Sequence, residues 1–322
     1  MNTKSYRGVI LDRDSFDRDD LDLTELQGCP VQWTNHCHTA RSETSTRTSD
    51  AEIIITNKVV IDREVIDASP NLKLILAAAT GTDNIDVTYC REKGIAVCNA
   101  RNYSTPAVVQ HTIALMLNLL TNQHRYLQDV RDGLWSQSNV FCLIDHPIVE
   151  TAGKTLGIIG YGAMGKRVAE VAAVLGMEVL VSQRPGGKPA AARVTLEELL
   201  SQSDVVSLHC PLTDDTRGLL GEAEFRLMKN QAVVINTARG AIVDIDALAR
   251  ALDQGEIGGA GIDVFDGEPP AADNVLLQLD CPNLIITPHN AWATQESRQR
   301  LVDIIAGNIR AWADGSPTNT VT

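Results

Sequence analysis

Residues 154–165 read Lys-Thr-Leu-Gly-Ile-Ile-Gly-Tyr-Gly-Ala-Met-Gly, and this stretch decides the fold. Its apolar part predicts a buried strand that ends at Gly160, the first glycine of a G-x-G-x-x-G pattern completed by Gly162 and Gly165. The apolar residues that follow repeat at the spacing of an amphipathic helix: Val168, Val171, Ala172 and Leu175. A strand, a glycine-rich turn and a helix in this order are typical of a dinucleotide-binding site.

Each glycine has a separate role in such a turn. Gly160 permits the tight turn, Gly162 lets the backbone approach a pyrophosphate, and Gly165 lets the helix pack closely on the strand. The backbone N–H groups of Ala163 and Met164 then face an anion at the positive end of the helix dipole. The sequence therefore predicts that these five residues bind the pyrophosphate of a dinucleotide.

The residues that would face the adenosine ribose carry no carboxylate. An acidic residue usually stands about 20 residues beyond the glycines and grips the ribose hydroxyls, but residues 182–184 read Ser-Gln-Arg. Gln183 can bond a ribose hydroxyl without repelling a 2′-phosphate, and Arg184 either pairs with that phosphate or is a solvated loop cation. We therefore expect NAD(H) and NADP(H) both to serve as cofactor.

Short apolar runs rich in Val and Ile alternate with helix-like stretches, as in βαβ units with parallel sheets. The runs form two sets: 9–11, 53–56, 74–77 and 95–98, then 155–160, 179–181, 205–209, 233–236, 261–264 and 284–287. We therefore predict an α/β fold with two doubly wound parallel-sheet lobes. A helix over 105–120, begun by Thr105-Pro106, is expected to bridge the lobes, and a helix over 293–313 to return to the first lobe.

Composition limits the classes of partner. The 322 residues have room for about two domains, and 28 Lys and Arg against 41 Asp and Glu give a net charge of -13. Such a field repels nucleic acid and anionic membrane surfaces. We see no signal-peptide core at the N-terminus and no membrane span, and the seven cysteines form no C-x-x-C pair. A cytoplasmic protein with reduced thiols and no metal site is expected.

Three ionisable residues follow the ends of three separate strands of the second set. Arg239 follows run 233–236, Glu268 follows 261–264, and His289 follows 284–287. Taken singly, each has an ordinary structural interpretation: a loop arginine, a solvated glutamate before a proline, and a C-cap histidine. In a doubly wound sheet, however, ligands bind beyond the carboxyl ends of the strands, so the three side chains are candidates for one site.

The three residue types match the oxidation of a 2-hydroxy acid. Hydride leaves C2 as a proton leaves the hydroxyl, and His289 is the side chain suited to accept that proton near neutral pH. A carboxylate at Glu268 would favour the imidazolium and fix the tautomer of the ring. Arg239 offers a planar fork for a carboxylate and can polarise the carbonyl, supplying the local positive charge that the whole chain lacks.

Together with the surrounding motifs, these residues resemble the D-isomer-specific 2-hydroxyacid dehydrogenase family over nearly the whole chain. The motifs that carry the resemblance are Ala79–Asp86, Gly160–Gly165, His209–Leu212, Met228-Lys229 and the three catalytic segments. The resemblance implies a Rossmann nucleotide-binding domain (103–290) inserted into a flavodoxin-like substrate domain (1–102 and 291–322). It also implies a homodimer formed through the nucleotide-binding lobe.

The resemblance also implies roles for individual residues. Arg239 and His289 would contact the substrate, Glu268 would pair with His289, and Asp263 would meet the nicotinamide carboxamide. Thr80 and Gly81 would offer backbone N–H groups to the substrate carboxylate. Further positions at the cofactor would be Cys210, Pro211, Thr237, Ala238 and Ala291, with His289 also beside the nicotinamide. The departure from the commonest family pattern is Gln183, which stands where an aspartate is usual.

Within the family, three segments look most like those of glycerate dehydrogenases, also called hydroxypyruvate reductases: 56–59, 103–112 and 288–293. The expected pair is D-glycerate and hydroxypyruvate, or glyoxylate as the keto acid. A D-3-phosphoglycerate dehydrogenase is the alternative, disfavoured because the chain ends at Thr322 without the added regulatory domain of many such enzymes. The formate-oxidising branch of the superfamily is disfavoured, because by resemblance that branch carries Gln where Glu268 stands. An alternative of another class is an NAD(H)-sensing corepressor-like binding protein.

Overall fold

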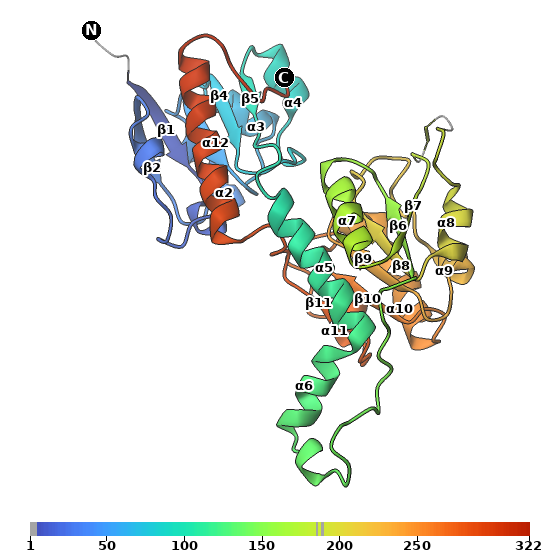
Figure 1. Cartoon of the computed structure of the whole chain (residues 1–322). Coiled ribbons are helices and arrows are strands. Elements are labelled where there is room, and N and C mark those ends of the chain that lie inside the picture. The colour runs from blue at the N-terminus through green and yellow to red at the C-terminus, as the bar shows by residue number, and fades with distance from the viewer. Residues whose placement is uncertain (1–4, 185, 188–189) are drawn as a thin grey trace. The chain divides into compact units, whose positions relative to one another are not determined.

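Two parallel sheets run through the described residues of the computed structural model, which are 5–184, 186–187 and 190–322 (Figure 1). The chain divides into two compact units. Unit 1 comprises Met1–Ser104 and Trp292–Thr322, and unit 2 comprises Thr105–Ala291. Each unit contains one of the sheets, so the expectation of two α/β lobes is confirmed.

The sheet of unit 1 has the strand order 2-1-3-4-5, which is that of flavodoxin-like folds. Its strands, in spatial order, are β2 (Val31–Asn35), β1 (Tyr6–Ile10), β3 (Ile53–Thr56), β4 (Leu74–Ala77) and β5 (Ala96–Cys98). The edge strand β2 is missing from the sequence-based prediction. It pairs on one side only and is mostly exposed, so its sequence lacks the apolar run of a central strand.

Helices cover both faces of this sheet. They are α1 (Thr24–Gln27), α2 (Arg41–Thr48), α3 (Arg63–Asp67), α4 (Val87–Glu92) and α12 (Gln295–Ala313), with a 3-10 turn η1 at Arg13–Ser15. As predicted, the C-terminal helix returns to the first lobe: Leu301, Ile305 and Ile309 of α12 are buried against one face of the sheet. The helix begins at Gln295 because the Thr294 side chain accepts a hydrogen bond from the backbone N–H of Ser297.

The sheet of unit 2 is also wholly parallel. In spatial order its strands are β11 (Leu284–Ile286), β10 (Gly259–Ile262), β9 (Val233–Asn236), β8 (Val205–Leu208), β6 (Thr155–Ile159) and β7 (Glu178–Val181). Starting at β6, the chain first adds β7 on one side and then β8 to β11 on the other. The direction reverses between β6 and β8, and ligands bind at such a reversal beyond the carboxyl ends of the strands.

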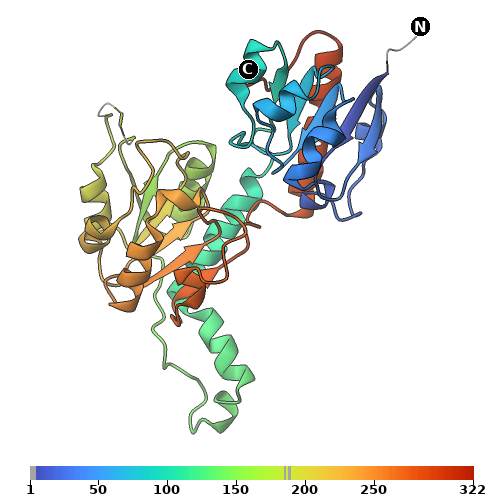
Figure 2. The same cartoon turned by 180° about the vertical axis from the view of Figure 1, so that it is seen from behind.

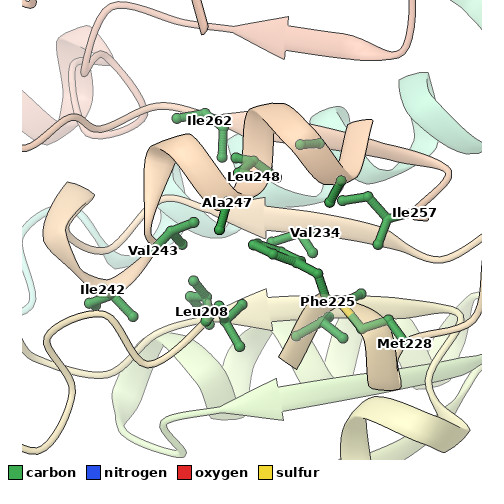
Figure 3. Close-up of a cluster of buried hydrophobic side chains, with 14 of the residues drawn as sticks. Leu208, Phe225, Met228, Val234, Ile242, Val243, Ala247, Leu248, Ile257 and Ile262 are labelled. Carbon is green, nitrogen blue, oxygen red and sulfur yellow. The ribbon is translucent and has the colours of Figure 1, made fainter. Parts of the chain in front are cut away.

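All residues of β8, β9 and β10 are buried, because helices pack on both faces of the sheet. One face is covered by α5 (Thr105–Thr121) and α7 (Ala163–Val174). The other is covered by α8 (Leu196–Gln202), α9 (Glu222–Leu227), α10 (Ile245–Asp253) and α11 (Val275–Gln278). Figure 3 draws the second cluster, with the Phe225 ring of α9 beside Val234 of the sheet.

An arm leaves unit 2 after α5. It consists of α6 (Gln123–Arg131), the 3-10 turn η2 (Trp135–Gln137) and the chain to residue 148, and it projects away from the sheet of its own unit (Figures 1 and 2). We call residues 123–148 the arm segment. The segment is anchored at its base, where the Asn122 side-chain amide donates to the Pro147 carbonyl over 2.7 Å. Among the described helices, α5 included, none has the length and apolar content needed to cross a membrane.

Candidate active site

Three neighbouring strands of unit 2 end at the same level and bring three loops side by side. Ile262 of β10 is in register with Ile286 of β11 and with Asn236 of β9. Asp263 therefore comes directly after the central of the three strands. The loop of Arg239 begins beside it on one side, and the loop of His289 begins beside it on the other. The sequence placed these loops at one edge from the strand order expected of the fold, and the registers agree.

The His289 and Glu268 side chains form a direct pair. Nδ1 of His289 lies 2.5 Å from Oε2 of Glu268, and the two side chains are 29% and 27% exposed. The other carboxylate oxygen, Oε1, accepts a hydrogen bond from the Phe265 backbone N–H over 2.9 Å. An ionised carboxylate only accepts, so Nδ1 carries the proton of this bond. Proton exchange with a substrate therefore falls to Nε2 of the ring.

The turn that carries His289 is held by a buried carboxylate. His289 has a φ of 50°, in the left-handed region that costs a residue with a side chain about 1–2 kcal/mol. Asp263, 1% exposed, accepts from the Thr287 hydroxyl (2.6 Å) and from the backbone N–H groups of Asn290 (3.0 Å) and Ala291 (3.0 Å). The carboxylate thus grips the turn on both sides of His289, which compensates for the unfavourable backbone conformation.

This role of Asp263 was missed by the sequence analysis, which placed the residue only at the nicotinamide. The available signal was an acidic residue directly after a fully buried apolar strand. A charge at that point needs several hydrogen-bond donors, and the next loop along the edge can supply them as backbone N–H groups.

The Arg239 loop is fixed by a buried amide and by one close contact. The Asn236 side chain, 1% exposed, accepts from the Ala238 N–H and donates to the Arg239 carbonyl, each over 3.0 Å. A Cβ built on Gly240 would lie 2.0 Å from the carbonyl carbon of Phe265, so this position accepts only glycine. The backbone after Arg239 is therefore in direct van der Waals contact with the backbone of the loop that carries Glu268. Thr237, in the same loop, is tied to α5 by a 3.1 Å bond between its hydroxyl and that of Thr112.

The glycine turn lies at the reversal between β6 and β8. Gly160 has a φ of 97°, and a Cβ on it would lie 2.4 Å from the backbone nitrogen of Cys210, at the end of β8. A Cβ on Gly165 would lie 2.1 Å from the Gly160 carbonyl oxygen. Both positions require glycine for steric reasons, and the first contact places Cys210 at the turn, with Pro211 the next residue along the chain.

Gly162 differs from the other two glycines because a Cβ built on it meets no atom of the described chain within 4 Å. It is the N-cap residue of α7, so the first N–H groups of the helix, on Ala163 and Met164, have no carbonyl within the helix to bond. Open space beside Gly162, at the end of the helix where the first N–H groups lack acceptors within the helix, suits a pyrophosphate. The turn therefore fits the dinucleotide that the sequence pattern predicts.

Gln183 and Arg184 follow β7, the strand beside β6. Gln183 is partly buried, and its backbone N–H donates to the Val194 carbonyl over 2.8 Å. Arg184 is exposed, and its carbonyl accepts from the Gly187 N–H over 2.8 Å. Pro185, the next residue along the chain, lies outside the described residues. The structure thus places an uncharged side chain and a cation where an acidic residue is usual.

His209, just after β8, was quoted in the sequence only as part of a motif. Its ring Nε2 lies 2.8 Å from the Ser207 hydroxyl, and burial lowers the pKa of the ring to about 4. The imidazole is therefore neutral at physiological pH. The His209 backbone takes part in the close contact with Gly160. The phosphate-binding turn therefore lies next to a residue whose imidazole is uncharged.

Thr80 and Gly81 belong to unit 1, whereas the other predicted site residues belong to unit 2. They lie in the loop after β4, at the carboxyl edge of the unit 1 sheet. The Thr80 hydroxyl donates to the Ala100 carbonyl over 2.8 Å, and the Thr80 carbonyl accepts from the Asn99 amide over 2.7 Å. These bonds hold the loop rigidly within its own unit.

A parallel sheet with a dinucleotide turn at its reversal point and a paired histidine beside an arginine loop defines a nicotinamide-dependent oxidoreductase. The model of the "D-isomer specific 2-hydroxyacid dehydrogenase, NAD binding domain" matches residues 113–291. The chain is 44% identical to a glycerate dehydrogenase of Methylorubrum extorquens, over 97% of this chain and 98% of that one. It is 39% identical to a hydroxypyruvate reductase of Blautia hydrogenotrophica, over 97% and 98%.

A solved structure of an NADPH-dependent glyoxylate/hydroxypyruvate reductase from Sinorhizobium meliloti matches with a TM-score of 0.83 and 25% identity, covering 98% of each chain. The chain belongs to the D-isomer-specific 2-hydroxyacid dehydrogenase family. The resemblance stated from the sequence is confirmed. The protein is an NAD(P)-dependent oxidoreductase that acts on hydroxy acids, and its cofactor is a nicotinamide dinucleotide.

Proposed function

We propose that this enzyme interconverts hydroxypyruvate and D-glycerate, and that it also accepts glyoxylate. The single observation that carries the catalytic part is the 2.5 Å pair of His289 and Glu268. The loop that carries Glu268 is in contact with the loop of Arg239. The substrate rests on the 44% and 39% identity to a glycerate dehydrogenase and a hydroxypyruvate reductase. Both relatives match along nearly their whole length, so no large insertion separates them from this chain.

In the proposed mechanism, the guanidinium of Arg239 binds the keto acid and polarises its carbonyl, and the backbone N–H groups of Thr80 and Gly81 bind the carboxylate. When bound, a reduced nicotinamide supplies the hydride that reaches C2. The Nε2 proton of His289 passes to the carbonyl oxygen, which becomes the hydroxyl of the product. Glu268 stabilises the imidazolium before this transfer through its bond to Nδ1.

The cofactor is held by groups beyond the ends of β6, β7, β9, β10 and β11. The N–H groups of Ala163 and Met164 would take the pyrophosphate, and Gln183 would take the adenosine ribose. Thr237, Ala238, Ala291 and Asp263 would line the nicotinamide end, with the Asp263 carboxylate as acceptor for the carboxamide. The neutral Gln183 and the exposed cation of Arg184 support use of both NADH and NADPH.

The reaction is tested by following nicotinamide absorbance at 340 nm with NADH and with NADPH. Hydroxypyruvate, glyoxylate, pyruvate and 3-phosphohydroxypyruvate are compared at matched concentrations. The proposal requires hydroxypyruvate to have the highest kcat/KM. A preference for the phosphorylated acid would establish the phosphoglycerate alternative instead, and tight cofactor binding with no turnover on any acid would favour a sensing protein.

We further propose a homodimer formed through the arm segment. Eight of its apolar side chains are about half exposed or more, and Phe141 reaches 89%. They are Leu127, Val130, Leu134, Trp135, Val140, Phe141, Ile144 and Ile148. An exposed apolar set of this size on a projecting segment is typical of a protein interface, and a second copy would supply a matching surface.

The dimer proposal is tested by light scattering on the purified chain and on Phe141→Asp and Ile144→Asp variants. We expect a dimer for the natural chain and monomers for both variants. Val174→Asp is the matched control, because Val174 is 88% exposed on α7, outside the arm segment. A monomeric natural chain at micromolar concentration would refute the proposal.

Two further assignments follow from the family and the composition. Residues 1–102 and 291–322 form the substrate domain and 103–290 the dinucleotide-binding domain, with ends within two residues of the boundaries of units 1 and 2. The net charge of -13 and seven free cysteines support a cytoplasmic location. Fractionation of the native host would test the location.

A further inference from the structure

A side chain outside the predicted site bonds directly to the group that holds the His289 turn. His111 lies on α5, and its Nε2 is 3.0 Å from the Thr287 hydroxyl and 3.6 Å from Oδ1 of Asp263. The His111 side chain is 23% exposed, and that of Asp263 is 1% exposed. Helix α5 packs on the sheet at β9 and β10, which places His111 within reach of the loop after β11.

The donor in this bond follows from counting protons. A threonine hydroxyl has one proton, and that of Thr287 is directed at Oδ1 of Asp263 over 2.6 Å. The Thr287 oxygen can therefore only accept from His111, so Nε2 of His111 must carry a proton. The neutral Nε2–H tautomer and the imidazolium both satisfy this requirement. His111 thus donates to Thr287, and Thr287 donates to the buried carboxylate of Asp263, which only accepts.

The direction of the chain has a mechanical consequence. Without the N–H of His111 donating to its oxygen, the Thr287 hydroxyl could rotate away from Asp263. The Asp263 carboxylate would then lose one of its three donors. A buried charge with an unmet hydrogen bond destabilises the loop that holds it. This loss would add to the cost of the left-handed backbone conformation of His289. The remaining bonds to Asn290 and Ala291 lie on only one side of His289.

We propose that His111 is a positioning residue for the reaction. Its Nε2–H fixes the Thr287 hydroxyl on Asp263, and the locked turn then holds the His289 ring against Glu268. His111 does not touch the reacting atoms in this scheme and moves no proton. The kinetic part of the inference rests on the proposed hydroxy-acid function, whereas the structural part concerns the His289–Glu268 bond alone.

The test compares two variants of His111 in the full-length enzyme. His111→Leu keeps much of the volume and removes the donor, whereas His111→Gln places an amide N–H donor within reach. With hydroxypyruvate and NADH, we expect His111→Leu to lower kcat at least tenfold while the KM for NADH stays within twofold. His111→Gln should recover kcat to within about threefold of the natural enzyme. Loss of fold alone would lower both parameters or the active fraction, and circular dichroism and active-site titration measure that directly.

A second readout does not depend on turnover. Proton NMR of the natural chain should show an exchange-protected Nδ1–H signal from the His289–Glu268 bond. We expect this signal to disappear in His111→Leu and to return in His111→Gln. Nitrogen NMR should also place a proton on Nε2 of His111. An enzyme inactive on every hydroxy acid but with this NMR pattern would refute the proposed function and leave the positioning role standing.

The positioning role is overturned if His111→Leu keeps kcat within twofold and retains the protected signal. It is also overturned if Nε2 of His111 carries no proton, or if His111→Gln is as impaired as His111→Leu. Thr287→Val supplies the matched control, since it removes the middle of the same chain. The double variant His111→Leu with Thr287→Val should be no worse than the more impaired single variant.

Discussion

Nδ1 of His289 lies 2.5 Å from Oε2 of Glu268, although the two residues are 21 positions apart along the chain. Because Oε1 of the same carboxylate is bonded to the Phe265 N–H, Glu268 is held in place independently of its histidine partner. A carboxylate positioned in advance stabilises the imidazolium at no further cost in side-chain entropy.

Replacing Glu268 by Gln should move the pH profile of keto-acid reduction towards acid. Reduction needs the protonated imidazole, and an amide oxygen stabilises that cation less than a carboxylate does. The high-pH limb of kcat/KM should therefore fall at lower pH than in the natural enzyme. Steady-state rates between pH 5 and 9 measure this. A limb that stays in place would mean that Glu268 does not act on His289.

Replacing His289 by Ala should lower kcat by a factor on the order of 10²–10⁴, the usual contribution of a positioned general acid. Cofactor affinity should change little, because the pyrophosphate turn lies at the other end of the sheet edge. Fluorescence titration with NADH serves as the control. Near-normal kcat would remove His289 from the mechanism.

Replacing Arg239 by Lys should raise KM for the keto acid, lower kcat, or both, by more than tenfold. An ammonium cannot form the two parallel bonds that a guanidinium makes to a carboxylate. The variant keeps the charge and the Gly240 contact, so it isolates geometry from electrostatics. Changes within about twofold, far below the tenfold that ~1.4 kcal/mol represents, would place the anchor elsewhere.

The two cofactors should support turnover with kcat/KM values within roughly a hundredfold, or about 2.7 kcal/mol. Gln183→Asp should shift the ratio towards NADH, because the new carboxylate repels a 2′-phosphate. Arg184→Gln is the matched control, because it removes a positive charge instead of adding a negative one. It should weaken the binding of NADPH more than the binding of NADH. A natural preference for NADH above about a thousandfold would show that another group excludes NADPH.

Stability should depend on pH through His209. Burial lowers the pKa of its ring to about 4, whereas an unfolded histidine has a pKa of about 6.5. The unfolded chain therefore binds the proton first, and stability falls as the pH drops from about 6.5 to about 4. Between pH 7.5 and 5, this loss amounts to about 2 kcal/mol.

Urea unfolding at pH 7.5 and pH 5 checks this contribution. His209→Gln should lose about 2 kcal/mol less than the natural chain over that interval, because no proton is taken up at position 209. Equal losses in the two proteins would mean that His209 is not the responsible group. Each unfolding curve must first be shown to be two-state.

Much of the fold and the list of candidate residues could be predicted from the sequence because local pattern determines them. The spacing of its glycines identifies the turn after β6, and Arg239, Glu268 and His289 each follow an apolar run, fully buried in β9 and β10 and partly buried in β11. The edge strand β2 could not be predicted in this way. Its Trp33 ring packs over Gly8 of β1, where a Cβ would lie 2.5 Å from the ring, and that fit becomes visible only once the strands are paired.

The support behind the site was likewise beyond the sequence. His111 and Asp263 are 152 residues apart, and nothing in the helical repeat of α5 distinguishes a histidine that donates towards a loop from one that faces solvent. The buried amide of Asn236 is similar, because its two bonds are short-range but depend on how the chain turns after β9. Residues that act through other residues are found from geometry, whereas residues that touch a ligand are often found from pattern.

The contact of Gly240 with Phe265 and Asp266 has a consequence for engineering. Since backbone meets backbone there with no side chain between them, the loops after β9 and β10 are a single exchangeable part. A chimera that imports residues 263–268 from a relative of different substrate preference, but keeps residues 237–242 of this chain, would join two surfaces shaped against different partners. Swapping both loops as one module preserves their fit, so the unit of specificity transfer in this enzyme is a pair of loops.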